Sequence, residues 1–173
     1  MVNCLHVAGN DHLLSGSKDT TIKYWQLSTL ECIRTFSGHR GFVTCIERLD
    51  EKTFLSGSKD NTIKMWNLET GECLKSLPGH SDFIKVIQGS KDNQILSLSN
   101  DGELKQWDIK TNSSFSFKSD DNEKISYFRI LKSGNLITAY SKGRAKLWSS
   151  KEFELKDDEG DYNSENFFRC SLM

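Results

Sequence analysis

The 173-residue sequence lacks any long hydrophobic run and any helical pattern. No stretch approaches the ~18 consecutive apolar residues of a membrane-spanning helix, and no window repeats apolar residues with a 3.6-residue period. Residues 1–6 show neither the basic nor the apolar region of a secretory signal. These absences predict a soluble, helix-poor protein, cytoplasmic or nuclear, without a membrane partner.

A charge excess and reactive motifs are also missing. The net charge of −1, with a pI near 6.4, gives no basic surface to attract nucleic acid. The sequence contains no nucleophile elbow, phosphate loop or Cys-x-x-Cys pair, and His6 and His12 have no Cys or His neighbours at ligand spacing. We therefore expect no catalysis, no metal and no cofactor.

What the sequence does contain is a strict period of 41 residues. Its four tryptophans, Trp25, Trp66, Trp107 and Trp148, follow one another at that interval. The segment Leu-Ser-Gly-Ser-Lys-Asp occurs at 14–19 and again at 55–60, and the Gly-His pair at 38–39 returns at 79–80. Such self-similarity indicates one supersecondary unit repeated four times.

Within one period the pattern predicts four short strands, at residues 42–48, 53–58, 62–68 and 72–77. These segments are rich in β-branched and aromatic residues and are separated by turn formers. Four antiparallel strands per period make one propeller blade. Because both faces of most strands are partly apolar, the core should lie between successive repeats.

The order Gly-His, apolar run, Ser-Gly-Ser-x-Asp and β-rich segment ending in Trp resembles the WD40 repeat family. This resemblance covers about residues 1–150 and implies an all-β fold of WD40-type β-propeller blades. Four four-stranded antiparallel blades are expected at about 1–37, 38–78, 79–119 and 120–155, as an incomplete propeller or part of a larger ring. Residues 156–173, acidic and then aromatic, are expected to be a disordered tail or the start of an incomplete blade.

The recurring polar residues allow two interpretations. His39, Ser56 and Asp60 have the composition of a hydrolase triad. The resemblance implies instead a structural chain of hydrogen bonds from the Trp indole through a hydroxyl and a His to the Asp of a turn, which leaves no buried polar group unpaired. We favour the structural chains, whose members are Ser15, Asp19 and Trp25; His39, Ser56, Asp60 and Trp66; His80, Ser97, Asp101 and Trp107; and Thr138 and Trp148.

Two blades depart from this pattern. Met1 aligns just past the position of a first Gly-His, so the first blade lacks the His of its polar chain. In the fourth blade, Lys142 replaces the Asp of the chain and Asp121 occupies the position of the His. We expect this blade to be more loosely packed than the others.

The cysteines follow the same period. Cys4 and Cys45 occupy one repeat position, and Cys32 and Cys73 another. Equivalent positions in adjacent blades are too far apart for a disulfide, so we expect free, buried cysteines in a reducing compartment.

The resemblance also implies a binding surface. In propellers of this family a partner binds across the narrow top face around the channel. The equivalent positions here are Lys18, Phe42, Thr44, Lys59, Phe83, Lys85 and Asn100. Two aromatic anchors among lysines suit a peptide with an apolar side chain beside acidic or phosphorylated residues. In the alternative, the phenylalanines only pack and the lysines are solvated.

Three functions follow from these patterns. The leading hypothesis is a noncatalytic scaffold that binds a protein or peptide. A ubiquitin-ligase substrate receptor is the second, since residues 57–73 look like the repeats of F-box WD proteins. An enzyme with a site in the channel mouth, built from His39 and Asp60, is the third.

The number of repeats leaves closure of the ring open. Propellers close with about four to eight blades. The four repeats predicted here could belong to a longer propeller, form a ring by self-association of two copies, or close tightly on their own.

Overall fold

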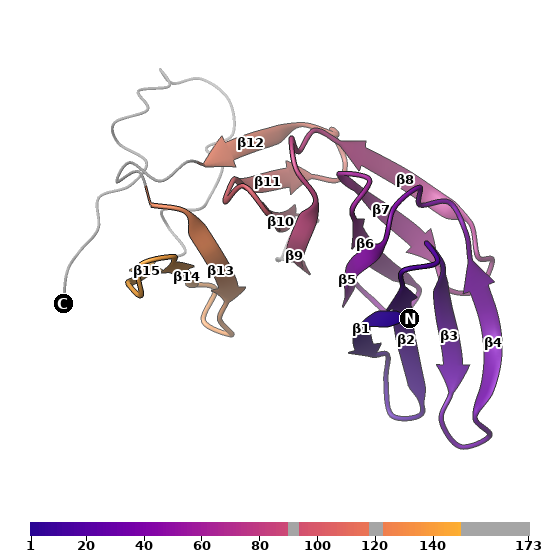
Figure 1. Cartoon of the computed structure of the whole chain (residues 1–173). Coiled ribbons are helices and arrows are strands. Elements are labelled where there is room, and N and C mark those ends of the chain that lie inside the picture. The colour runs from indigo at the N-terminus through magenta and orange to yellow at the C-terminus, as the bar shows by residue number, and fades with distance from the viewer. Residues whose placement is uncertain (90–93, 118–122, 150–173) are drawn as a thin grey trace. The chain divides into compact units, whose positions relative to one another are not determined.

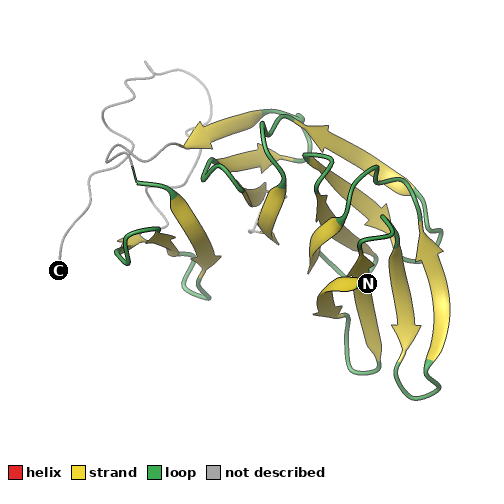
Figure 2. Cartoon of the chain, in the orientation of Figure 1, coloured by secondary structure: helices red, strands yellow, loops and turns green. Residues whose placement is uncertain are grey.

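The computed structural model describes residues 1–89, 94–117 and 123–149, and every regular element in these ranges is a β-strand (Figure 2). The chain divides into two compact units, residues 1–118 and 119–173, which are described separately. None of the described segments forms a helix capable of crossing a membrane.

Unit 1 contains three four-stranded antiparallel sheets, each formed by strands consecutive in the sequence. Blade 1 consists of β1 (Val2–Val7), β2 (His12–Ser17), β3 (Ile22–Gln26) and β4 (Glu31–Phe36). Blade 2 consists of β5 (Val43–Arg48), β6 (Thr53–Ser58), β7 (Thr62–Asn67) and β8 (Cys73–Pro78). Blade 3 consists of β9 (Ile84–Gly89), β10 (Gln94–Ser99), β11 (Leu104–Asp108) and β12 (Ser114–Phe117).

The four strands of blade 2 lie within one residue of the predicted segments. Within unit 1, β4, β8 and β12 lie on the outer side, whereas the neighbouring strands β1, β5 and β9 lie on the inner side (Figure 1).

Unit 2 contains blade 4, an antiparallel sheet of β13 (Ile125–Ile130), β14 (Leu136–Tyr140) and β15 (Ala145–Trp148). Its described part thus has three strands. The outer strand expected near Phe153 and Leu155, and the tail expected at 156–173, lie outside the described residues.

The strand register repeats with the sequence period. Each Trp pairs with the residue twelve positions before it, as in Phe54↔Trp66 and Ile95↔Trp107. The tight turn between the second and third strands also repeats. Thr20, Asn61, Gly102 and Gly143 all have positive φ values there. One backbone conformation therefore recurs in all four blades although the residue that adopts it changes.

The hydrophobic core lies between blades, as predicted. We call the blade face that contacts the preceding blade its N-side face, and the opposite one its C-side face. Between blades 1 and 2, the C-side face of blade 1 contributes Leu14, Ile22 and Phe36. The N-side face of blade 2 contributes Val43, Ile46, Phe54, Trp66 and Leu68. Leu55, Ile63 and Leu77 face Ile84, Ile87, Ile95, Trp107 and Ile109 in the same way between blades 2 and 3.

The cysteines of the described residues are free, but their burial differs from the prediction. Cys4 and Cys45 lie on inner strands against the cores between blades, and burial raises the pKa of Cys45 to about 12. Cys32 and Cys73 are exposed on the outer strands β4 and β8. The prediction of burial is wrong for this pair because the outer strands have a solvent-facing side. Cys170 lies outside the described residues.

Blades 2 and 3 approach so closely that only glycine fits at position 57. A Cβ atom there would lie 2.6 Å from Ile84 Cγ2 and 2.7 Å from Cys45 Sγ. We expect Gly57→Ala to cost about 1–3 kcal/mol through overpacking, measured as a lower midpoint in denaturant unfolding. Gly89→Ala is the matched control, because among the described residues a Cβ there would meet only the movable end of Leu49, 3.0 Å away. Equal midpoints for the two variants would contradict this tight contact.

Candidate functional site

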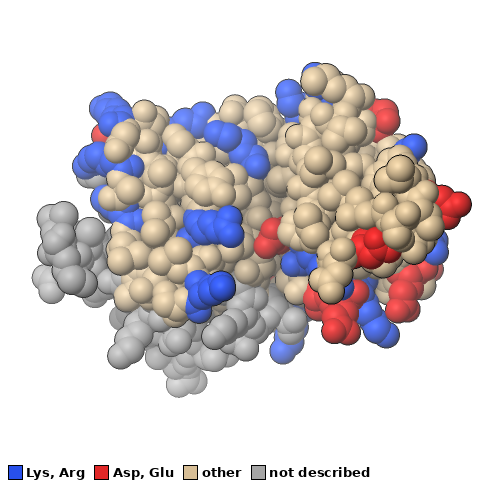
Figure 3. Space-filling view, turned by 90° about the horizontal axis from the view of Figure 1, so that it is seen from below, with Lys and Arg blue, Asp and Glu red and all other residues tan. Residues whose placement is uncertain are grey.

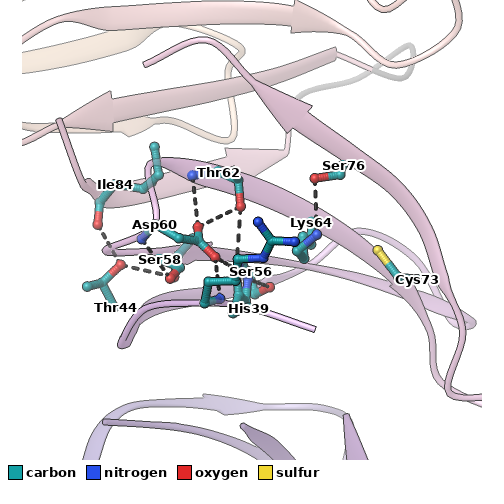
Figure 4. Close-up of polar contacts among 12 residues, drawn as sticks. His39, Thr44, Ser56, Ser58, Asp60, Thr62, Lys64, Cys73, Ser76 and Ile84 are labelled. Carbon is teal, nitrogen blue, oxygen red and sulfur yellow. Dashed lines mark hydrogen bonds and ion pairs between the residues drawn. The ribbon is translucent and has the colours of Figure 1, made fainter. Parts of the chain in front are cut away.

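A continuous hydrogen-bonded chain crosses blade 2. The Trp66 indole N–H donates to Ser56 Oγ at 2.8 Å, and Ser56 Oγ lies 2.7 Å from His39 Nε2. His39 Nδ1 lies 2.8 Å from Asp60 Oδ2. Figure 4 shows the His39, Ser56 and Asp60 side chains pointing toward one another. The four residues predicted to form a chain in this blade therefore do so.

Each proton in this chain has one consistent position. Ser56 Oγ accepts from the indole, so its own hydroxyl is free to donate to His39 Nε2, and Nδ1–H then donates to Asp60. Burial of the ring lowers the pKa of His39, against the opposing effect of Asp60. Burial raises the pKa of Asp60, but hydrogen bonds from Thr62, the Arg40 N–H and His39 outweigh it and bring this pKa to about 2. A neutral imidazole beside a carboxylate is thus the stable form.

The geometry also matches a Ser-His-Asp triad, but no substrate can reach it. Ser56 is 0% exposed, and the side chain of His39 is fully buried. A nucleophilic hydroxyl must approach a substrate carbonyl, whereas the Ser56 oxygen is enclosed between an indole and an imidazole. The buried chain is therefore part of the core.

Blade 3 repeats the chain with a different acid. Trp107 Nε1 donates to Ser97 Oγ at 2.7 Å, and Ser97 Oγ lies 2.7 Å from His80 Nε2. The group at His80 Nδ1, however, is Glu103 Oε2 at 3.2 Å. The prediction that Asp101 fills this role is wrong.

The reason is that Glu103 stands in blade 3 where blade 2 has Thr62, one period earlier. In blade 2 the Thr62 hydroxyl already lies 3.5 Å from His39 Nδ1. Glu103 occupies the equivalent position and is long enough to bind the ring. Asp101 instead accepts hydrogen bonds from the hydroxyls of Ser81 and Ser99. Glu103 also pairs with the buried Lys105, whose Nζ lies 3.2 Å away.

In the described residues of the first and fourth blades, the indole–hydroxyl step of the chain is present. Trp25 Nε1 donates to Ser15 Oγ at 2.8 Å, and Trp148 Nε1 to Thr138 Oγ1 at 2.9 Å. Asp19 accepts hydrogen bonds from the Thr21 N–H and hydroxyl. These bonds stabilise the turn and do not connect Asp19 to the indole–hydroxyl pair. Asp121, expected at the His position of blade 4, lies outside the described residues.

A second group of residues, which we call the Lys–Phe ladder, runs along one end of unit 1. It consists of Lys18, Phe42, Lys59 and Phe83. Lys18 Nζ lies 5.7 Å from the centre of the Phe42 ring; Lys59 Nζ lies 5.4 Å from Phe42 and 5.0 Å from Phe83. Because these residues come from three blades, the ladder crosses both boundaries between them.

The backbone holds the ladder in register. Lys59 N–H donates to the Phe42 carbonyl, and Asn100 N–H donates to that of Phe83. These bonds join the turn before the third strand to the residue that precedes the first strand of the same blade. Lys18 and Lys59 are exposed, and Phe42 is 37% exposed.

The three other predicted contact residues have different surroundings. Thr44 is half-buried, and its hydroxyl donates to the carbonyls of Ile84 (2.5 Å) and Gly57 (3.0 Å), so it joins two inner strands. The Asn100 side chain donates to Asp82 at 2.8 Å. Asn100 occupies the position that Lys18 and Lys59 have in the first two blades, so blade 3 has no lysine there. Lys85 is half-buried on β9 and has an interaction of its own. The structure thus brings four of the seven predicted residues into one surface.

Two features were missed by the sequence analysis. Glu103 carried a signal, because comparison at the 41-residue offset places it on Thr62, next to the His. The stacking of each lysine on the phenylalanine of the following blade carried none, since it depends on how the blades pack. Among the described residues, no cluster of His, Cys, Asp and Glu could hold a metal ion.

Comparison with known proteins agrees with this architecture. The family model described as "WD domain, G-beta repeat" matches residues 1–26, 30–67 and 71–108, more than half of the chain. The chain belongs to the WD40 repeat family.

Two related WD40 sequences match over segments about one repeat long. F-box/WD repeat-containing protein 10 of Mus musculus is 45% identical over 47 residues, which is 27% of this chain and 5% of that protein. A p21-activated protein kinase-interacting protein 1-like sequence of Xenopus laevis is 45% identical over 42 residues, 24% of this chain and 12% of that protein. These segments cover a small part of the relatives' length.

Solved WD40-type structures match over most of the chain. The WD40 β-propeller domain of Doa1 is 27% identical with a TM-score of 0.77, over 86% of this chain and 50% of that chain. The computationally designed protein Ika4 is 30% identical with a TM-score of 0.73, over 86% of this chain and 91% of that chain. WD40 propellers are generally protein-interaction scaffolds.

The buried chain of blade 3 should support stability. His80→Ala removes the imidazole that contacts Ser97 and Glu103 and leaves the buried Ser97 hydroxyl without its acceptor. An unpaired buried group costs about 1–3 kcal/mol. We expect the melting temperature to fall by about 3–10 °C. His12→Ala is the control, because His12 is half-buried and stacks on Tyr24 outside any such chain. An unchanged melting temperature in His80→Ala would show that the chain does not stabilise the blade.

Stability should also fall as the pH is lowered from 7 to 5. The pKa values of His39 and His80 are lowered by burial, so the unfolded chain binds more protons below about pH 6.5. Their contribution is complete above that pH and is lost as the pH falls through the folded pKa. Asp60 adds nothing in this window, because its pKa is about 2 in the fold and about 3.9 in the unfolded chain.

The measurement is the melting temperature as a function of pH. His80→Ala should show a shallower decline than the wild type between pH 7 and 5. Some decline should remain, because the pKa values of His39 and of His6, on β1, are also lowered by burial. Identical slopes in the two proteins would exclude His80 as a source.

Proposed function

We propose that this WD40 chain is a noncatalytic protein-interaction scaffold whose Lys–Phe ladder binds an acidic peptide segment. The observation that carries the proposal is the alternation of exposed cations and rings across three blades, with Nζ-to-ring distances of 5.0–5.7 Å. The exposed ladder is chemically suited to binding, in contrast to the buried hydrogen-bonded chains.

Stacking prepares the lysines for binding. A cation over an exposed ring gains about 0.5–1 kcal/mol, which limits the rotation of a long side chain. Less conformational entropy is then lost when a carboxylate approaches. Lys59 contacts both rings, so its ammonium group is the most restricted point of the ladder.

The ladder also has a direction. At its blade 1 end Lys18 carries a positive charge, whereas at the blade 3 end Asp82 holds Asn100. A carboxylate there would be repelled by Asp82. We therefore expect the acidic residues of a peptide over Lys18 and Lys59, and an apolar side chain against the exposed part of Phe42.

The surface charge favours a peptide over nucleic acid. On the face drawn in Figure 3, basic groups are separated by broad uncharged areas. A phosphate backbone is normally bound by a continuous basic stripe. With a net charge of −1, the chain also has no general attraction for polyanions.

A substrate receptor of a ubiquitin ligase is the more specific candidate. It is supported by the relationship of one repeat to F-box/WD repeat proteins, at 45% identity over 47 residues. Such a role on this surface would favour phosphorylated peptides. The ladder contains lysines and no arginine, so it lacks the bidentate fork that distinguishes phosphate from carboxylate, and we expect modest discrimination.

The test is binding of a fluorescein-labelled peptide in which four glutamates flank one leucine, followed by fluorescence anisotropy. We expect Lys59→Ala to weaken binding about two- to fivefold, since exposed ion pairs contribute about 0.2–1 kcal/mol each. Added salt should weaken the wild-type complex through screening. The same peptide with phosphoserine in place of one glutamate measures the preference for phosphate.

Lys52→Ala is the matched control, because Lys52 is an exposed lysine in the β5–β6 turn, at the opposite end of the same blade. Its affinity should equal that of the wild type. If Lys59→Ala and Lys52→Ala bound the peptide equally well, the ladder would not be the binding surface. A phosphate preference above tenfold would favour the receptor role.

A further inference from the structure

Within the described residues of unit 1, no other blade covers the N-side face of blade 1. Val2, Leu5 and Leu27 are 55%, 61% and 40% exposed. Leu13 and Trp25, on the same face, are half-buried. The equivalent residues of blade 2, at most 7% exposed, are Val43, Ile46, Leu68, Phe54 and Trp66. The same apolar positions are thus buried against blade 1 in blade 2 and exposed to solvent in blade 1.

Blade 4 has the complementary exposed surface, on its C-side face. Tyr127, Ile137 and Leu147 are 48%, 36% and 50% exposed. Two and three periods earlier, these positions correspond to residues that pack against the following blade in unit 1: Cys45, Leu55 and Met65 of blade 2, and Cys4, Leu14 and Tyr24 of blade 1. The chain therefore carries both halves of one further blade–blade interface.

We propose that two copies of this chain associate head to tail, so that the C-side face of blade 4 in each copy covers the N-side face of blade 1 in the other. A two-fold axis makes the two contacts identical and closes the assembly. Eight blades result, within the range of about four to eight found in propellers. This inference is independent of the function proposed for the ladder.

Two observations favour a second copy as the occupant. The interface would be continuous with those between blades 1, 2 and 3, because the same repeat positions form it. Both required faces occur on one chain.

The experiment is light scattering coupled to size exclusion on the whole 173-residue chain at micromolar concentration. We expect a mass of twice the 19.7 kDa of the monomer. A monomer would overturn the proposal, and would indicate that another polypeptide or the chain itself covers these faces.

Single substitutions then test which faces are used. Leu5→Asp places a charge on the N-side face of blade 1, and Leu147→Asp places one on the C-side face of blade 4. Each variant alone should be monomeric with a wild-type circular dichroism spectrum, because both side chains are exposed in the single chain. Leu30→Asp is the control, since Leu30 is 79% exposed in the β3–β4 turn and should leave the dimer intact.

Mixing the two variants provides the decisive result. Leu5→Asp retains an intact C-side face on blade 4, and Leu147→Asp an intact N-side face on blade 1. The mixture should therefore recover dimers through one unaltered contact, with lower affinity than the wild type. Dimers that persist in either variant alone, or no dimer in the mixture, would overturn the head-to-tail arrangement.

Discussion

The structure depends on packing between blades. A four-stranded sheet with apolar residues on both faces cannot bury them alone, so each blade is stable only against a neighbour. Phe36 of blade 1, for example, packs edge-on against Phe54 and Trp66 of blade 2, with ring centres 4.9 and 5.8 Å apart. This requirement accounts for the recurrence of the same apolar strand positions in each repeat, because every blade must present them to its neighbours.

The buried polar chains follow from the same requirement. A tryptophan is large enough to fill the space between blades, but its N–H then needs a partner away from water. The Ser hydroxyl accepts from the indole, the imidazole contacts the hydroxyl, and an acid nearer the protein surface contacts the imidazole, so each buried polar group has a partner. In blade 3 the acid changes from Asp to Glu and moves by two positions, yet the imidazole keeps a carboxylate. Preservation of the pairing, with a changed residue, is what a structural role predicts.

The ladder connects the scaffold to its proposed function. Each of its lysines precedes a tight turn, and each phenylalanine precedes an inner strand, so their positions are set by rigid elements. The cation–ring contacts occur only because successive blades bring one blade's turn beside the next blade's strand. Contacts of this kind belong to no single repeat, so the sequence pattern of one repeat does not predict them.

The sequence by itself determined the repeat, the strands of blade 2 to within one residue, the position of the core in unit 1 and the indole–hydroxyl pairs. These features depend on spacing along the chain, and the register of adjacent antiparallel strands transmits that spacing directly. Only the tertiary structure decided that Glu103 replaces Asp101 at His80, that the Thr44 hydroxyl joins two strands, and that Lys59 lies between two rings. The His80–Glu103 contact depends on side-chain length, and the other two depend on the distance between blades, which the sequence pattern of one repeat does not specify.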